Sequence, residues 1–360
     1  MEYIRLVSMG EQSIISKERI IWIDQLKFVG IYLVILAHSG INQMLHNYIY
    51  AFHMPLFFFI SGFLFSFEKI KNFQSFLRKR SIQLLKPYLF FNIMTYLFWF
   101  FVGRKFGADS SLDISPFTPL IGIIYGNGTG YYFIHAPALW FLPCLFVVEI
   151  LFYLAFKQVE HFLLSICIIF SFLVLGKILL IYKLMFLPWS INVALIAIFF
   201  YWLGYYSRRF GIFKNGSSIW EFFSILLLGL IFYFSVPVNG PVDMSSSSYG
   251  NIILFMINAT IGLVVSLLIT KACSKFSISL IDLLGQNTLI ILAFHVILLS
   301  CIKGTAFYIF NIPLIYFESN IAMNCIVALL ALILCLVPIY IINRFFPYMI
   351  GKNLYTSLKT

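Results

Sequence analysis

Charged side chains are scarce in this sequence. Asp, Glu, Lys and Arg make up only 10% of its 360 residues, whereas 62% are hydrophobic and 19% are aromatic. A soluble domain carries roughly 25% charged residues, so this composition excludes an ordinary soluble fold and indicates a chain that folds in lipid. A cleavable signal peptide is not expected, because the first apolar run is too long, carries Asp24 and Lys27, and is not followed by a small-residue cleavage site.

Other common features are also missing. The six cysteines show neither metal-ligand spacing nor a disulfide framework, so we expect no bound metal. The chain has no internal repeat, which argues against transporters built from duplicated halves. It also has no linker long enough to separate two domains. Residues 104–137, rich in Gly, Ser, Pro and Tyr, predict a surface loop, and residues 244–249 predict a second, shorter one.

Long apolar runs dominate the sequence instead. A spanning helix needs about 20 mostly apolar residues, and this criterion predicts an all-α, polytopic membrane protein with about ten transmembrane helices. The predicted spans are 21–40, 48–67, 84–103, 138–156, 162–182, 188–207, 219–236, 251–271, 279–301 and 322–343. The ninth is the least regular, because Asp282, Gly285, Gln286 and Asn287 dilute its start.

The distribution of basic residues predicts the orientation. With the N-terminus inside, only four of the 24 Lys and Arg residues fall in outer loops (Arg104, Lys105, Lys183 and Lys303), two fall within spans, and the remainder lie on the cytoplasmic side. This asymmetry predicts a chain with both termini in the cytoplasm. The net charge of +11 therefore reflects topology, and we expect no nucleic-acid partner.

Three segments follow from this topology. Residues 1–18 are predicted to be a cytoplasmic N-terminal segment, residues 19–345 a single transmembrane domain, and residues 346–360 a cytoplasmic tail.

The first predicted span carries three polar residues of interest. Lys27 and His38 are eleven residues apart, about three helical turns, so both point to one face and lie roughly 16 Å apart along the helix. Polar groups on one face of a membrane helix commonly mark a pathway. Alternatively, Asp24 and Lys27 form an interfacial pair, and His38 is simply buried.

Two further histidines are predicted in the outer half of the membrane. His53 starts the second span and is expected level with His38 across a short hairpin, and His295 lies in the ninth span. Histidine is the side chain best suited to exchange a proton near neutral pH. His46 and His135 are predicted to lie in loops and receive no role.

Glu149 and a basic run are the remaining charged candidates. Glu149 lies deep in the fourth span, where a carboxyl group is either functional, paired, or protonated and structural. The run between the second and third spans carries Arg78, Lys79, Arg80 and Lys86. It either keeps this segment inside the cell or clamps the phosphates of a cytosolic donor.

Several motifs then stand in the order seen in a known family. They are the run from Arg19 to Asp24 with Lys27 and His38, HMPLFFFISGFLF (53–65), the basic run ending at Pro87-Tyr88, LWFLPCLF (139–146), NVALIAIFFYWLGYY (192–206) and LGQNTLIILAFH (284–295). From residue 19 to 343 the sequence resembles the acyltransferase-3 family of bacterial membrane O-acyltransferases. One departure is that Arg80 is followed three places on by Gln83, where the family has a second arginine.

The resemblance implies an activity and a set of residues. Family members transfer an acyl group, usually from acetyl-CoA, to sugars or polysaccharides, and lie in the bacterial inner membrane. A basic residue followed after ten others by histidine matches Lys27 and His38, which implies that His38 is catalytic. The candidate catalytic residues are His38, Asp24 and His53, the candidate donor-binding residues are Lys27, Arg78, Arg80 and Lys86, and the further candidates are Glu149, His295 and Asn287.

The expected reaction uses acyl-CoA as a co-substrate and no bound cofactor, with membrane lipid and a sugar or polysaccharide acceptor as the other partners. His38 would take the proton of the acceptor hydroxyl, and His53 would orient His38 or stabilise the oxyanion. Two alternatives stay open: a transporter of glycans or lipid-linked sugars, and a non-catalytic subunit of an envelope polysaccharide assembly complex.

Overall fold

The fold is all-α, as predicted. The computed structural model describes residues 20–106, 108–184, 186–212, 219–274, 278–318 and 320–352. Its α-helices are α2 (Ile21–Ala37), α3 (Gln43–Tyr50), α4 (His53–Leu64), α5 (Phe73–Arg80), α6 (Lys86–Phe98), α7 (Arg104–Phe106), α8 (Phe117–Tyr125), α9 (Phe141–Phe156), α10 (Phe162–Ile181), α11 (Ile191–Arg209), α12 (Ile219–Asn239), α13 (Ile252–Cys273), α14 (Ser279–Gln286), α15 (Thr288–Tyr308), α16 (Ile321–Leu334) and α17 (Leu336–Phe345). Within those ranges the β-structure is one isolated antiparallel bridge between Asp243 and Ser248.

The chain is a polytopic membrane protein. In the described ranges, eight helical segments are long and apolar enough to cross a bilayer: Gln43–Leu64, Phe73–Phe106, Phe162–Ile181, Pro188–Arg209, Trp220–Asn239, Ile252–Cys273, Thr288–Tyr308 and Ile321–Phe345. Each coincides with one of the ten predicted spans. The other two predicted spans are helical but shorter, because α2 has 17 residues and α9 has 16.

The basic run between the second and third predicted spans is helical. Asn72 caps the N-terminus of α5 by accepting a hydrogen bond from the Ser75 backbone, and the Ser75 hydroxyl closes a reciprocal capping box. From Phe73 the helix continues through a π-helical turn at Ser81–Leu85 into α6 and on to Phe106. Arg78, Lys79 and Arg80 therefore project from the first turns of a long membrane helix.

Two predictions need correction. Residues 104–137 are not simply a loop, because they contain α8, whose C-terminus is closed by Gly126 in the left-handed conformation at φ 66°. The predicted span 279–301 is broken at Asn287 into α14 and α15. The polar residues that diluted its start mark this break.

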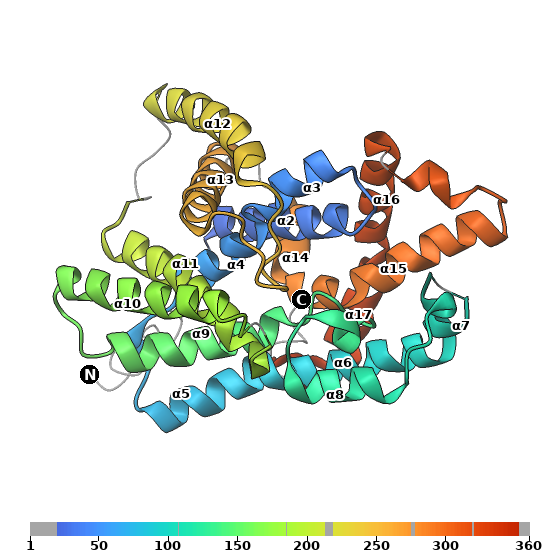
Figure 1. The fold of residues 1–360 in the computed structure, drawn as a ribbon, viewed down its shortest axis with the longest axis horizontal. Helices are drawn as coiled ribbons and strands as arrows, with labels where there is room; N and C mark the ends of the chain where they lie inside the picture. Colours follow the sequence, from blue (N-terminus) through green and yellow to red (C-terminus); the bar gives the residue numbers. More distant parts are fainter. Residues whose placement is uncertain are drawn as a thin grey trace, which may run out of the picture.

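The centre of the bundle is packed very closely. A side chain at Gly62 in α4 would collide with the backbone of Tyr201 in α11, and one at Gly204 in α11 would collide with the backbone of Phe59. Paired glycines let two membrane helices approach backbone to backbone. Figure 1 shows α2 in the middle of the molecule, among α4, α13, α14 and α16, with α12 at the edge beside α13.

The orientation in the membrane gives a direct prediction. A reporter fused after Thr360 should report the cytoplasm, and one inserted beside Ser110 should report the outside, because the basic residues favour the inner side. Residues 1–19 and 353–360, which hold most of the two predicted cytoplasmic segments, lie outside the described residues. Reporting from the same side at both positions would contradict the predicted topology.

Candidate active site

One face of α2 carries the candidate residues. Lys27, Ile31, Val34 and His38 follow one another at intervals of four, three and four residues, the spacing of a single helical face. Lys27 and Ile31 line one cavity, and Val34 and His38 line another. This face therefore joins two internal spaces along the length of the helix.

The first space, which we call the histidine cavity, has a volume of about 210 Å³ and is lined by His38, Tyr50, His53, Trp140, Asp243 and Ser245, among others. The predicted pairing of two histidines at one level is realised here, because His38 ends α2 and His53 begins α4. These six residues contribute two imidazoles, one carboxylate, the hydroxyls of Ser245 and Tyr50, and two large aromatic rings. Such a set of groups suits a polar ligand with an apolar face.

His53 has a defined hydrogen-bonding state. Its Nδ1 lies 2.9 Å from the carbonyl oxygen of Ile49. A carbonyl can only accept, so Nδ1 must donate, and the neutral ring then carries its lone pair on Nε2. The residue is 3% exposed, and its ring lies 4.8 Å from the ring of Tyr50. Neutral His53 can accept a hydrogen bond through Nε2, but it has no second N–H to donate to an oxyanion.

His38 stands at the C-terminal end of α2. Its backbone N–H donates to the carbonyl oxygens of Val34 and Ile35, so the residue closes the helix. The C-terminus of a helix carries partial negative charge and favours a cation nearby, which suits a histidine that becomes protonated. In the described part of the chain, no hydrogen bond is found to the His38 ring itself, while the His295 ring lies 5.2 Å away between centroids.

Asp243 is the residue that sequence reasoning missed. Its Oδ1 accepts hydrogen bonds from the backbone N–H of Ser245 at 2.9 Å and the Ser245 hydroxyl at 2.7 Å, and its Oδ2 accepts from the Ser246 hydroxyl at 2.8 Å. The pairing of Asp243 with Ser248 closes this turn. The only signal in the sequence was a single Asp before four serines, which is typical of a turn. The fold places this carboxylate in the wall of the histidine cavity.

The second space, which we call the apolar cavity, has a volume of about 200 Å³. Lys27 lies in its wall, together with Ile31, Met54, Phe57, Ser61 and Leu292. Met54 lines this cavity and the histidine cavity as well. The two spaces thus meet at one unbranched side chain, a residue type that repacks readily.

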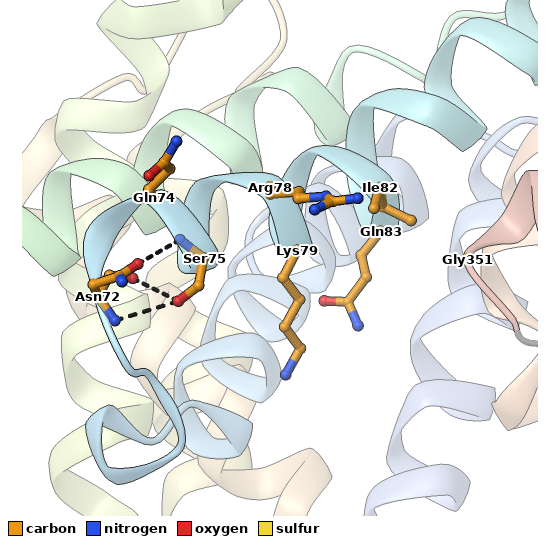
Figure 2. A pocket seen from close by; sticks show the side chains of 8 residues that line it. All are labelled: Asn72, Gln74, Ser75, Arg78, Lys79, Ile82, Gln83 and Gly351. Carbon is orange, nitrogen blue, oxygen red and sulfur yellow. Dashed lines mark hydrogen bonds between the residues drawn. The ribbon is translucent and has the colours of Figure 1, made fainter.

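A third space, which we call the basic cavity, lies along α5 and has a volume of about 600 Å³. Its lining includes Arg78, Lys79, Gln83 and, from the C-terminal segment, Gly351. Figure 2 shows Lys79 and Gln83 extending to the same side of the helix, with Gly351 on a separate segment across from them. Two cations in an open cavity can hold an anionic group.

Arg80, which the sequence predicts to bind the donor, is not among the residues that line this cavity. Its Nε lies 2.8 Å from Glu149 Oε2, and one terminal nitrogen donates to Gln83 Oε1 at 2.9 Å. Glu149 is 3% exposed, and its Oε1 receives a long hydrogen bond of 3.5 Å from the Tyr201 hydroxyl. Glu149 is therefore paired with Arg80. Gln83 stands where the resemblance places a second arginine, and it accepts a hydrogen bond from Arg80.

Lys86, another residue predicted to bind the donor, does not line the basic cavity either. Its Nζ lies over the ring of Tyr348, close to the ring centre, in a cation–π contact. Asn287 accepts a hydrogen bond from Asn343 at 2.9 Å and one from Lys352 at 3.5 Å. Burial lowers the pKa of this Lys352 ammonium group. The contacts of Tyr348 with Lys86 and of Lys352 with Asn287 attach the C-terminal segment to the bundle.

Asp24 lies far from the histidine cavity. It is fourteen residues from His38 on the same helix, about 21 Å along the axis, and it forms an ion pair with Lys27 at 3.3 Å. The expectation of a catalytic Asp24 thus finds no geometric support. Its position instead suits a role in orienting the Lys27 ammonium group at the edge of the apolar cavity.

His135 is buried, although the sequence indicated only a loop residue. Its Nε2 lies 3.0 Å from Asn92 Oδ1, while Asn92 donates through Nδ2 to the Tyr88 carbonyl. Asn92 Oδ1 must therefore accept the hydrogen bond from His135. Burial lowers the pKa of His135 to about 4, so the ring is neutral at physiological pH. It fastens the segment before α9 onto α6.

Comparison with known protein families assigns most of the chain to one family model. A family model described as an acyltransferase domain, Acyl_transf_3, matches residues 20–342, which is most of the chain. No curated protein and no solved structure matches the sequence.

Proposed function

This chain belongs to the acyltransferase 3 family of membrane acyltransferases, and on that premise we propose that it transfers an acyl group, in the first place acetyl, from acyl-CoA to a hydroxyl of a cell-envelope sugar or polysaccharide. The proposed acceptor class includes O-antigen, capsule and exopolysaccharide, and the proposed location is the bacterial inner membrane.

The observation that supports this proposal best is the succession of cavities along α2. The apolar cavity extends from Lys27 to Met54, and the histidine cavity continues from Met54 to His38. An acyl thioester on its flexible arm is apolar enough for the apolar cavity, whereas a sugar hydroxyl suits the histidine cavity. Donor and acceptor would then meet beside Met54 without either crossing the membrane completely.

The proposed chemistry is a direct displacement. The acceptor oxygen attacks the thioester carbonyl carbon while His38 takes the hydroxyl proton, and this positioned proton transfer is typically worth 10²–10⁴-fold. The new C–O ester bond forms, the C–S bond breaks, and the protonated His38 returns its proton to the departing thiolate. His53, with its lone pair on Nε2, is suited to accept a hydrogen bond from the acceptor rather than to donate one to the oxyanion.

The charged part of the donor needs a separate site. CoA carries phosphates that cannot enter an apolar space without a large desolvation cost. The basic cavity, with Arg78 and Lys79, is the proposed phosphate site, and Lys27 would hold the start of the arm. Arg80 and Lys86 are not part of the proposed phosphate site, because Arg80 is paired with Glu149 and Lys86 contacts the ring of Tyr348.

The same features weigh against transport of a free glycan. A sugar path through the membrane needs polar walls over its whole length, but the space next to Lys27 is lined mainly by aliphatic and aromatic side chains. A non-catalytic subunit would tolerate the loss of His38.

The proposed reaction is tested directly with purified protein. It should release free CoA from acetyl-CoA only when a sugar acceptor is present, measured as thiol release and as acylated product. If acetyl-CoA remains intact with every acceptor tested, the proposal is contradicted.

The proposed donor site predicts a selective loss of affinity. Reversing both charges, Arg78→Glu with Lys79→Glu, should raise KM for acyl-CoA about tenfold or more, because each lost charged hydrogen bond is worth roughly 1.5–3 kcal/mol. The effect should shrink at high salt, where the wild-type contact is screened. KM is measured in detergent over a range of ionic strength.

A matched control separates this effect from topology. Lys69→Glu with Lys71→Glu makes the same charge change on two exposed residues of the same connection that do not line the basic cavity. The control should leave KM near wild type. If both double variants raise KM for acyl-CoA equally, the basic run serves only to keep this segment on the cytoplasmic side.

A further inference from the structure

His295 in α15 carries an unsatisfied acceptor in the core of the protein. The residue is 0% exposed, and its Nδ1 lies 3.1 Å and 3.0 Å from the carbonyl oxygens of Ile291 and Leu292. Both oxygens can only accept, so Nδ1 is the protonated nitrogen. A second proton would place an isolated cation in an apolar interior, which is strongly unfavourable. Nε2 therefore carries a lone pair.

This Nε2 atom is buried and makes no hydrogen bond among the described residues. A buried acceptor without a donor is destabilising, and native structures normally satisfy it or use it. The His38 ring lies close to the His295 ring: the two centroids are 5.2 Å apart, and the planes are tilted by 51°. A rotation of the His38 side chain at this separation brings an N–H of His38 toward Nε2 of His295.

Other groups near His38 are less suited to accept from it. Asp243 already accepts three hydrogen bonds from Ser245 and Ser246. His53 lines the histidine cavity, where its own lone pair is available to a ligand. His295 does not line the histidine cavity, and its Nε2 has no hydrogen-bond partner among the described residues, so this lone pair is available to His38.

We infer that His295 is a positioning residue for His38: its Nε2 accepts an N–H from the His38 ring and fixes which His38 nitrogen is left unprotonated in the histidine cavity. The inference rests on the proposed function. When His38 takes the acceptor proton, one N–H of the imidazolium keeps its hydrogen bond to His295 Nε2. The other N–H gives its proton to the thiolate. His295 remains neutral throughout and only accepts.

The test compares two substitutions at this position. His295→Leu removes the acceptor, and kcat should fall about tenfold to a hundredfold, the usual cost of losing an orienting partner. KM for acyl-CoA should stay unchanged, because the donor site lies elsewhere. His295→Gln restores a carbonyl acceptor of similar reach and should recover a large part of kcat. Leu299→Ala, at a buried position one turn further along α15, controls for loss of packing and should not change kcat per inserted molecule.

A second measurement does not depend on activity. The ¹⁵N chemical shifts of labelled histidine rings, assigned through single His→Gln variants, should show one fixed tautomer for His38 in the wild type and a mixture in His295→Leu. A mixture in the wild type, or no change in the variant, would overturn the positioning role. The wild-type protein could also show a fixed His38 tautomer that His295→Leu loses, yet transfer no acyl group to any acceptor. That result would support the pairing of His38 with His295 and disprove the proposed function.

Discussion

Substitution of His38 by Gln is expected to lower the rate of acyl transfer by about two to four orders of magnitude, or roughly 2.7–5.5 kcal/mol of activation barrier. Gln keeps a polar side chain of similar reach but cannot take up and release a proton near neutral pH. The measurement is activity per correctly inserted molecule. Normalisation matters, because a purely structural His38 predicts less protein with nearly normal activity per molecule.

His53→Gln is the matched comparison in the same cavity. If His38 is the base, this variant should lose less activity than His38→Gln, and its loss should depend on the acceptor. Near-normal normalised transfer by His38→Gln would disprove the mechanism. A large loss in His53→Gln alone would move the base to α4, where the hydrogen bond to Ile49 already leaves Nε2 free to accept a proton.

Breaking the Arg80–Glu149 pair should have the second large effect, on stability. Arg80→Met leaves the Glu149 carboxylate buried without its cation, and removal of one partner from a buried ion pair costs about 3–5 kcal/mol. The thermal midpoint in detergent and the amount of inserted protein should both fall. Arg78→Met, two residues away in the open basic cavity, is the control and should be nearly neutral for stability.

The double variant Arg80→Met with Glu149→Leu completes this test. Replacing both members of a buried pair by apolar side chains of similar volume is often close to neutral, so the double variant should regain much of the stability lost in Arg80→Met. An additive loss would show that Glu149 contributes through another contact, such as that with Tyr201. Loss of acyl-CoA affinity in Arg80→Met at unchanged stability would return Arg80 to the donor site.

The parts of the fold and site that sequence could predict are those governed by local periodicity. Apolar runs located eight segments long enough to span a bilayer, and the spacing of Lys27 and His38 placed both on one face of α2. The polar start of the ninth span marked the break at Asn287. Each inference needed only the helical repeat and the hydropathy of neighbouring residues.

The remainder depends on contacts between residues distant in sequence. Arg80 and Glu149 are 69 positions apart, and nothing in either neighbourhood indicates that they meet. Asp243 reaches the histidine cavity because a serine turn carries it there after α12. The charges of the basic run mask the helical continuity that the Asn72 cap begins, so hydropathy alone starts the third predicted span only at residue 84. Tertiary packing decides all three.

The apolar cavity between Lys27 and Met54 has an electrical consequence under the proposed function. Moving one elementary charge across a membrane is worth about 2.3 kcal/mol per 100 mV. The phosphates of the donor stay beside Arg78 and Lys79, and the group that passes Met54 is a neutral acyl chain. In exchange the acceptor proton ends on the thiol, so that the thioester and alcohol on one side of the reaction and the thiol and ester on the other are all neutral at the reacting atoms. The voltage across the bilayer therefore does no net work on the transfer, and its direction is set by the free-energy difference between the thioester consumed and the ester formed.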